Sequence, residues 1–407
     1  MHVWIVHQFA NQPDQPGGTR QYEFARHLVT RGHQATVIAS DFNTELRTYR
    51  TTRPSRPVVR EVVNGVEWRW LYTTPYRIND WRRYVNMVSF CVSLIVAAVR
   101  LPRPDVIVGS SPQLPATYLA WLIARVRGAR FVFEVRDLWP QVLIDMAGKP
   151  ESDALVRLLR HFEQTLYRRS DAVVVFAQGA IEYVVAHGAP PERTHWLPNS
   201  IEAESFEVAI APPALRERFG LPPEPFVAVY AGAHGDANAL HVVVEAARLL
   251  ADTPGIHLAL FGDGPTKAAL VAAAAGLPNC SFHDAVPNTE VPQVLAAADA
   301  GLMPLKDVAL FRYGVSPRKL YDYYAAGRPV IAAVGGAVNR EVEEQGVGFT
   351  ASPEDPVGLA AAIRACAALS VSERQAMGCR ARSLARERYD RRPVAEAFER
   401  LVIELAA

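Results

Sequence analysis

The feature that most limits what this chain can fold into is a pattern that occurs twice. Near the start, the apolar run His2–Phe9 is followed by a polar loop, an amphipathic segment Thr19–Thr30 and a second apolar run Ala35–Ala39. The same order of strand, loop and helix restarts at Phe226–Ala231. Short buried strands that alternate with helices are typical of doubly wound domains with parallel sheets. The sequence therefore predicts an α/β fold.

The length and the prolines predict two domains. The chain has 407 residues, which is more than one ordinary core accommodates. The pairs Pro212-Pro213 and Pro222-Pro223 separate the two series. We expect a first domain of residues 1–203, a second of 204–385, and a C-terminal helical segment, 386–407, as a candidate to cross back to the first. Ligands of such sheets bind beyond the carboxyl ends of the strands, which predicts a site in a cleft between two Rossmann-like domains.

The composition limits the cellular compartment and the classes of binding partner that can be expected. Lysine plus arginine number 43 against 42 acidic residues, so net charge gives no reason to expect nucleic acid as a partner. The four cysteines are widely scattered, which predicts free thiols in a reducing cytoplasm and no metal site of cysteine type. The first residues lack a basic start and a long apolar run, so no signal peptide is expected.

Two strongly apolar segments, 80–101 and 115–125, lie beside clusters of arginine. The longest uncharged stretch, Tyr84–Val99, has 16 residues, fewer than the roughly 20 that span a bilayer, so no transmembrane anchor is predicted. Two interpretations remain open. The helices either pack against a parallel sheet as core, or present a face that docks on the inner surface of the cell membrane.

The stretch Tyr313–Ile331 contains the clearest candidate ligand site. It predicts a helix over Arg318–Ala326 that Gly327 ends. A helix N-terminus presents unpaired N–H groups and the positive end of its dipole, which suit phosphate. Arg318 and Lys319 add cations where the dipole itself favours acidic residues, which indicates an anionic ligand. The alternative is a surface helix with solvated basic residues.

The first loop carries a glycine pair, Gly17-Gly18, that would let the backbone approach a ligand closely. The loop lacks the G-x-G-x-x-G spacing, so a dinucleotide fingerprint is not supported. An ordinary flexible loop is the alternative.

Taken in order, the motifs resemble the retaining glycosyltransferases of family 4. The series GDGPTKAAL, AAADAGLMPL and SPRKLYDYYAAGRPVIAA is similar to their donor-binding half, and FEVRDLWP and LPNS fit their first half. The RDLWP and SPRK forms resemble a bacterial subgroup that builds surface polysaccharides by moving sugars, often N-acetylated aminosugars or related hexoses, onto lipid-linked acceptors. The resemblance implies the GT-B fold, with two Rossmann-like domains that face a cleft.

The resemblance also implies a nucleotide diphosphate-sugar donor, with UDP as the expected nucleotide. Backbone N–H groups near Gly18 and from Ser316 to Lys319 would meet the diphosphate, Arg318 and Lys319 would neutralise it, and Asp322 would bind the ribose hydroxyls. The other donor-binding candidates lie in loops that follow strands: Gly17, His234, Gly235, Gly262 and Gly264.

The chain departs from the family pattern at two places. Gly314 stands where relatives have a glutamate that contacts the sugar, and the usual arginine and lysine after the first strand of the second half are absent, with His234 available instead. These departures leave the sugar open.

The candidate catalytic residues are Arg136 and Asp137, where many relatives have a His-Asp pair. Arg136 would meet an acceptor phosphate and Asp137 would orient an acceptor hydroxyl. Asp137 as the cap of a helix near Trp139 is the alternative. The resemblance implies no metal or other cofactor, because cations and a helix dipole stabilise the leaving diphosphate.

Two other functions were compared with sugar transfer. One is a protein that binds nucleotide-sugars or polysaccharides without transferring a sugar, and the other is a nucleotide-sugar epimerase. Epimerisation needs acid-base carboxylates and a histidine around one sugar carbon, and the sequence shows no clear cluster of that kind.

Overall fold

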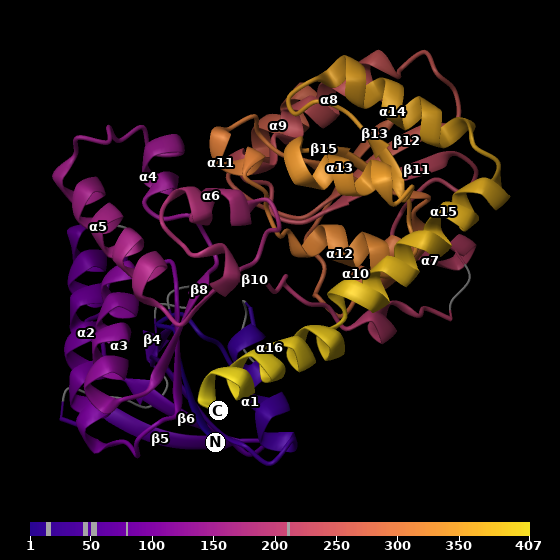
Figure 1. Ribbon diagram of the computed structural model, residues 1–407. Helices are drawn as coiled ribbons and strands as arrows, with labels where there is room; N and C mark the ends of the chain where they lie inside the picture. The colour runs from indigo at the N-terminus through magenta and orange to yellow at the C-terminus, as the bar shows by residue number, and fades with distance from the viewer. Residues whose placement is uncertain (14–17, 44–47, 50–54, 79, 210–211) are drawn as a thin grey trace. The chain divides into compact units, whose positions relative to one another are not determined.

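The computed structural model (Figure 1) describes residues 1–13, 18–43, 48–49, 55–78, 80–209 and 212–407. It divides into two compact units: unit 1 is Met1–Pro198 with Val394–Ala407, and unit 2 is Asn199–Pro393. The expected boundaries, 203/204 and 385/386, lie a few residues from these divisions. Each unit holds one largely parallel sheet with helices around it, so the predicted α/β fold with two Rossmann-like sheets is confirmed.

Unit 1 is built on a sheet in the order β10-β9-β8-β7-β1-β2-β6-β5. All of its pairings are parallel except that between β5 and β6, where Asn64 and Gly65 turn the chain with positive φ, as a two-residue hairpin loop requires. A separate pair, β3 and β4, is antiparallel. The strands are β1 His2–Val6, β2 Gln34–Ser40, β3 Phe42–Asn43, β4 Thr48–Tyr49, β5 Val58–Val63, β6 Val66–Leu71, β7 Val106–Ser110, β8 Arg130–Val135, β9 Ala172–Val175 and β10 Thr194–Trp196.

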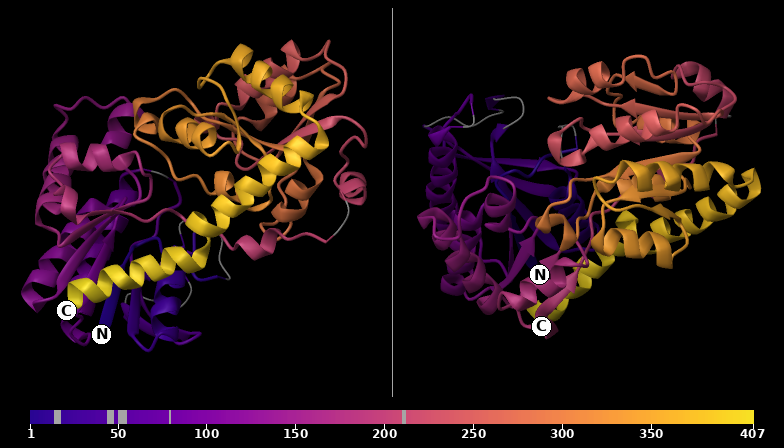
Figure 2. Two further views of the ribbon diagram at one scale, coloured as in Figure 1. Left: turned by 45° about the vertical axis from the view of Figure 1, so that its right-hand side comes forward. Right: turned by 90° about the horizontal axis from the view of Figure 1, so that it is seen from above.

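The helices of unit 1 include the end of the chain, α16. Its Phe398 stacks on Phe24 of α1 with ring centroids 4.2 Å apart, and its Glu399 lies 2.8 Å from His27. The C-terminal helix thus joins the core of unit 1 beside α1, as the views in Figures 1 and 2 show. The helices are α1 Arg20–Thr30, α2 Trp81–Arg100, α3 Leu114–Arg127, α4 Gln141–Asp145, α5 Ala154–Arg169, α6 Ala180–Ala186 and α16 Arg391–Ala406, with a 3₁₀ turn at Pro191–Arg193.

Helix α2 is longer than the uncharged stretch inside it. Asp80 caps it by accepting a hydrogen bond from the Arg82 backbone N–H at 2.9 Å, and the helix continues through Arg100. Its 20 residues are long and apolar enough to cross a membrane, by length and composition, and about a third of its most apolar window is buried. The helix extends beyond the 16-residue uncharged stretch at both ends, and the absence of a transmembrane anchor stays a prediction.

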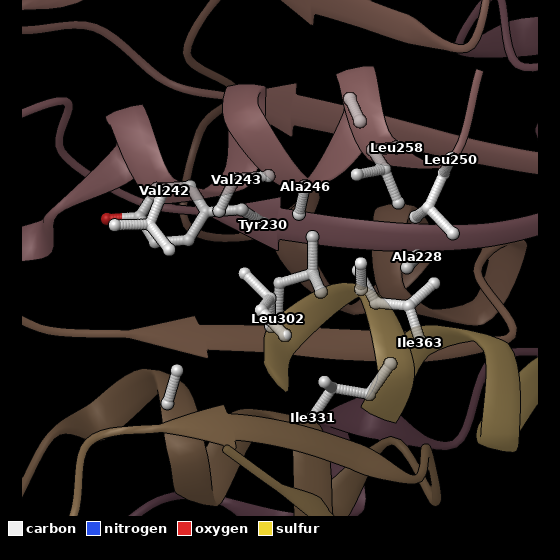
Figure 3. Packing of buried hydrophobic residues seen from close by; sticks show 14 of the residues in the cluster. Ala228, Tyr230, Val242, Val243, Ala246, Leu250, Leu258, Leu302, Ile331 and Ile363 are labelled. Atoms are coloured by element: carbon white, nitrogen blue, oxygen red, sulfur yellow. The ribbon is translucent and has the colours of Figure 1, made fainter. Parts of the chain in front are cut away.

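Unit 2 is built on a parallel sheet in the order β13-β12-β11-β14-β15-β16. Its core lies where β11, β12, β14 and β15 meet α8 and α14: Tyr230, Leu258 and Leu302 from the sheet pack with Val243 and Ile363 from the helices (Figure 3). The strands are β11 Phe226–Ala231, β12 Ile256–Phe261, β13 Cys280–His283, β14 Ala300–Pro304, β15 Val330–Ala333 and β16 Gly348–Thr350.

Helices lie between the successive strands of unit 2 from β11 to β15, and three more come after β15. The last of these, α15, begins with a capping box in which Ser370 and Glu373 bond each other's backbone N–H groups. The helices are α7 Pro212–Arg218, α8 Leu240–Leu249, α9 Lys267–Ala273, α10 Val291–Ala297, α11 Ala309–Arg312, α12 Arg318–Ala325, α13 Gly336–Glu344, α14 Pro356–Ala368 and α15 Val371–Leu384, with 3₁₀ turns at Ala203–Phe206 and Asp236–Asn238 and a π turn at Ala385–Tyr389.

Candidate active site

Helix α12 has the free N-terminus that the sequence predicts. Pro317 occupies its N-cap position, and among the described residues no side chain caps its first N–H groups. Gly327 lies just beyond its C-terminal end with φ +64°, as expected of a terminating glycine. The buried face of the helix holds it against β14 and β15. The first turn of α12 therefore presents unpaired donors at a fixed place in unit 2.

Lys319 is the half-buried cation of this turn. Its Nζ donates to Tyr230 Oη at 2.9 Å and to Asn238 Oδ1 at 2.6 Å, and it lies 4.5 Å from the centroid of the Tyr230 ring. No carboxylate of the described chain pairs with it. Burial lowers the pKa of Lys319 to about 7. A lysine held by neutral groups only is poised to accept an anion.

Asp322 lies one turn further along α12. Its Oδ1 is buried and finds no hydrogen-bond partner in the described part of the chain. Arg318 approaches the same oxygen only to 3.9 Å and is itself more than half exposed. Burial raises the pKa of Asp322 to about 7, with the Arg318 charge opposing the rise. An orphaned buried carboxylate oxygen is costly and indicates an acceptor for ligand donors.

Ser316 is tied to the first residue of unit 2. Its Oγ accepts from the Asn199 backbone N–H at 3.1 Å and lies 2.8 Å from Tyr321 Oη, while its carbonyl accepts from Asn199 Nδ2 at 2.9 Å. The LPNS motif therefore fixes the loop that precedes α12. Gly314 in this loop has φ +103°, a conformation that a glutamate rarely adopts.

The loops that follow β11 and β12 cross each other with their backbones in direct contact. The His234 backbone N–H donates to the Asp263 carbonyl at 2.8 Å, and the Thr266 N–H donates back to the His234 carbonyl at 3.1 Å. The His234 ring is fully buried, and neither ring nitrogen makes a hydrogen bond of normal geometry to a described residue. Burial lowers the pKa of His234, so the ring is neutral at pH 7.

The crossing explains two of the predicted glycines. A Cβ on Gly262 would lie 1.9 Å from the Gly232 carbonyl oxygen, and one on Gly264 would lie 2.5 Å from the His234 carbonyl oxygen. Both glycines also have positive φ, +144° and +154°. Their packing alone requires glycine, whether or not a ligand approaches them.

We expect Gly262→Ala to destabilise unit 2 by about 2–3 kcal/mol, because the methyl group must displace a backbone and the φ angle is strained. The measurement is chemical denaturation of the two proteins. The matched control is Gly255→Ala, where φ is +80° but no described heavy atom lies within 4 Å of the added carbon. Strain alone should cost this variant about 1 kcal/mol, and equal losses in both would contradict the crossing as the cause.

The candidate catalytic pair lies at the carboxyl end of β8 in unit 1. Ser111 Oγ accepts from the backbone N–H groups of Arg136 at 2.8 Å and Asp137 at 3.2 Å. The Arg136 Nη1 donates to His7 Nε2 at 2.6 Å, and an added carbon at Gly18 would lie 3.7 Å from Arg136 Nη2. Unit 1 thus brings together Gly18, Arg136 and Asp137.

Asp137 does not cap the helix that follows it. Helix α4 begins at Gln141 with Pro140 at its N-cap position, and no described side chain caps it. The Asp137 side chain is exposed. The capping alternative is therefore wrong for this residue, and its carboxylate remains available to a ligand.

Two residues of this edge were missed by the sequence analysis. His7, at the end of β1, is buried, and burial together with the Arg136 charge holds the pKa of His7 well below its usual range. Glu134, also buried, accepts from Arg20 Nε at 2.9 Å and Ser110 Oγ at 2.6 Å. A buried His-Arg contact or Glu-Arg pair leaves no spacing signal, because its members are far apart in the chain.

The donor-binding candidates of unit 2 form two groups. Ser316, Arg318, Lys319 and Asp322 lie on or before α12. Lys319 reaches the loop after β11 through Asn238, and a Cβ on Gly232 would lie 3.5 Å from Lys319 Cε, so the loop with His234 and Gly235 adjoins the first turn of α12. Gly17 lies outside the described residues. No group of three or more His, Cys, Asp or Glu able to hold a metal ion occurs in the described part of the chain.

The chain matches two protein families in succession. Residues 17–200 match a family described as Glycosyl transferase 4-like domain, and residues 225–368 match one described as Glycosyl transferases group 1. The two matches fall one in each compact unit.

Individual relatives agree with this assignment. The chain is 28% identical to WcaI of Escherichia coli K12, named for colanic acid biosynthesis glycosyl transfer, over 88% of this chain and 91% of that protein. It is also 28% identical to WbjE of Pseudomonas aeruginosa, named as a glycosyltransferase, over 71% of this chain and 72% of that protein.

The fold matches solved structures of the same architecture. The crystal structure of Anabaena HepE in complex with UDP superposes with a TM-score of 0.71 over 99% of this chain and 100% of that one, at 16% identity. Two domain families in the right order, relatives aligned over most of their length and a shared two-sheet fold lead to one conclusion. The chain belongs to the family 4 glycosyltransferases of GT-B fold.

Proposed function

We propose that this glycosyltransferase moves a sugar, an N-acetylated aminosugar or related hexose, from a UDP-linked donor to a lipid-linked saccharide acceptor in surface-polysaccharide biosynthesis, with retention at the anomeric carbon. Unit 2 binds the donor and unit 1 the acceptor. The observation that carries the proposal is the pair Lys319 and Asp322. They are three residues apart on α12, partly buried, and neither forms an ion pair shorter than 3.9 Å with any described residue.

The chemistry of the pair fits a nucleoside diphosphate. Lys319 and the free N–H groups of the first turn of α12 favour the two phosphates, which carry negative charge. Asp322, one turn deeper, offers carboxylate oxygens to two ribose hydroxyls. A cation and an acceptor at this spacing complement a ligand that is anionic at one end and donates hydrogen bonds at the other.

The comparisons support the donor and the pathway. HepE of Anabaena has been crystallised with UDP and with UDP-glucose, and it shares the two-sheet fold of this chain. Colanic acid biosynthesis appears in the name of one aligned relative, and a second, from Streptomyces coelicolor, is named as an exopolysaccharide phosphotransferase.

In the proposed reaction, the acceptor oxygen forms a bond to the anomeric carbon while the bond from that carbon to the donor phosphate breaks. The proton of the acceptor hydroxyl passes to an oxygen of the leaving phosphate, so no enzyme base is required. Lys319 and the amides of α12 stabilise the charge that develops on the leaving diphosphate. Asp137 orients the acceptor hydroxyl, and Arg136 binds an acceptor phosphate.

The role of Asp322 has a direct test. We expect Asp322→Ala to lower the affinity for UDP about 10–100-fold, because hydrogen bonds to a charged group contribute about 1.5–3 kcal/mol. The native protein should bind UDP more tightly than 2′,3′-dideoxy-UDP by a similar factor, and the variant should bind the two nucleotides equally. Isothermal titration calorimetry measures both affinities, and Asp252→Ala, an exposed aspartate of unit 2, is the control.

If Asp322→Ala still binds UDP more tightly than 2′,3′-dideoxy-UDP, Asp322 does not bind the ribose hydroxyls. The transferase proposal itself is tested by mass spectrometry of products from a panel of UDP- and GDP-sugars with polyprenyl-diphosphate-linked acceptors. UDP binding without product across the panel would favour a nucleotide-sugar-binding protein that lacks transfer activity, an outcome that the glycine at position 314 would explain.

A further inference from the structure

Helix α2 of unit 1 exposes an unbroken apolar stripe. The exposed side chains recur every three or four residues and so lie along one side of the helix. The largest exposed fractions are 78% at Val99, 66% at Trp81 and 62% at Val88. The stripe consists of Trp81, Tyr84, Val85, Val88, Val92, Ile95 and Val99. At a rise of about 1.5 Å per residue the stripe is roughly 27 Å long. Single exposed apolar residues are common on soluble proteins, but a continuous row of this length is not.

The opposite side of α2 is anchored by polar side chains. Asn86 accepts from Gln8 Nε2 at 2.7 Å and donates to Thr73 Oγ1 at 2.9 Å. Ser93 Oγ donates to the Tyr72 carbonyl at 2.7 Å. These bonds hold the helix along the edge of unit 1. A helix fixed in this way lies flat on whatever covers its stripe and does not cross a bilayer alone, although its composition is apolar enough.

The neighbouring helix α3 also exposes apolar side chains. Helices α2 and α3 pack side by side, as Figure 1 shows, and α3 exposes Leu122 and Val126, one turn apart, with Val126 87% exposed. Exposed apolar side chains therefore occur on both of two packed helices, and we name them together the α2–α3 face: the seven stripe residues of α2 with Leu122 and Val126.

Only positive charges border the α2–α3 face within its own segments. Residues 81–104 contain Arg82, Arg83, Arg100 and Arg103 and no acidic residue, and α3 adds Arg125. Arg82, Arg100 and Arg125 are exposed. An apolar stripe with arginines at its ends is the pattern that partitions into an anionic membrane surface, with the apolar side chains in the acyl boundary and the guanidinium groups at the phosphates.

A second copy of the same chain fits this face poorly. If two α2 helices paired antiparallel, Arg82 and Arg83 of each would meet Arg100 and Arg103 of the other; a parallel pair would set like ends together. Either arrangement places arginine against arginine with no acid in the segment to compensate. Anionic lipid supplies the complementary charge.

We propose that the α2–α3 face is a membrane-docking surface that binds bilayers containing anionic lipid. The proposal extends the proposed function, since a docked unit 1 would meet lipid-linked acceptors at the membrane surface, but vesicle binding tests it without any transfer reaction. The hydrogen bonds of Asn86 and Ser93, with the buried side chains of Phe90 and Leu94, hold one side of α2 inward and leave the stripe exposed.

The test is co-sedimentation of the full chain with phosphatidylcholine vesicles that contain about 30% phosphatidylglycerol, and with pure phosphatidylcholine. We expect binding to the anionic vesicles that falls as salt rises, and at least tenfold weaker binding by Val88→Asp/Val92→Asp. The matched control is Val357→Asp/Val371→Asp, two valines of unit 2 that are 67% and 62% exposed, compared with 62% and 58% for the pair on α2. A second variant, Arg82→Gln/Arg100→Gln, keeps the stripe and should mainly lower the salt dependence.

Circular dichroism and UDP titration accompany each variant, so that misfolding or loss of the donor site is seen separately from loss of lipid binding. Equal vesicle binding by the native protein and Val88→Asp/Val92→Asp, with both folded, overturns the proposal. A native dimer that this variant converts to a monomer in light scattering, without vesicle binding by either, also overturns it and assigns the face to self-association.

Discussion

Replacing Lys319 by alanine is expected to weaken UDP binding about 100-fold, equivalent to about 2.7 kcal/mol, and to lower kcat/KM for transfer at least as much. The ammonium has no carboxylate partner among the described residues, being held by Tyr230 and Asn238. A partly desolvated cation of this kind interacts strongly with a diphosphate, because no other ion competes for it. Lys319→Met, which keeps the apolar stem, should lose nearly as much affinity.

Lys306→Ala is the matched control for this prediction. Lys306 also lies beside the loop after β11, since its backbone N–H donates to the Ala237 carbonyl, but its ammonium already pairs with Asp236. Its loss should change UDP affinity less than about threefold, as is typical of exposed ion pairs. Unchanged affinity and rate in Lys319→Ala would remove the diphosphate assignment.

The lowered pKa of Lys319, about 7 in the free protein, also predicts proton uptake. A bound diphosphate favours the ammonium form and raises this pKa, so at pH 8 the free lysine is mostly neutral and must gain a proton on binding. In an Asp322→Asn variant, where the opposing effect of Asp322 is absent, the affinity for UDP should therefore fall between pH 6.5 and 8.5. Calorimetry in buffers of different ionisation enthalpy measures the uptake. Asp322, whose pKa is also about 7, should release a proton when its carboxylate accepts hydrogen bonds from the ribose. The substitution Asp322→Asn removes this release. Adding Lys319→Met to that variant should then abolish proton uptake on UDP binding.

Much of the architecture and the position of α12 could be predicted from the sequence. The strand-loop-helix order is local, and the termini of α12 are marked by Pro317 and Gly327, whose backbone preferences act within a few residues. The neighbours of Lys319 could not be predicted, because Tyr230 and Asn238 are about 80–90 positions away in the chain. Neither could the reason for Gly262, which is a backbone crossing and not an element of a motif.

The orientation of α2 was left open for a physical reason. The helix is apolar on both sides: Phe90 and Leu94 are buried together with Asn86 and Ser93, while Val88 and Val92 are exposed. Apolar periodicity normally identifies the buried side of a helix. Here the buried side is recognisable only from Gln8 and Thr73, whose side chains bond Asn86 across large separations in sequence.

Replacing Glu134 by alanine is expected to destabilise unit 1 by about 3–5 kcal/mol, because it leaves the buried Arg20 cation without its counter-ion. Arg20 is 5% exposed; besides Glu134 Oε1, 2.9 Å away, it donates to two backbone carbonyls, those of Leu197 and Pro198. The pair thus connects α1, the end of β8 and the LPNS segment. Chemical denaturation measures the loss, and weakened acceptor use is expected to accompany it, since Glu134 lies two residues before Arg136.

Glu67→Ala is the matched control, because Glu67 also pairs with two arginines of unit 1, Arg60 and Arg69, but is 23% exposed. It should cost about 1 kcal/mol or less. The double variant Arg20→Leu/Glu134→Leu separates ion pairing from packing. The comparison also needs the single variants Arg20→Leu and Glu134→Leu. If an uncompensated buried charge causes the loss in each single variant, the double variant will be more stable than the sum of the two single losses predicts. Additive losses would instead mean that the two side chains act only through the volume that they fill.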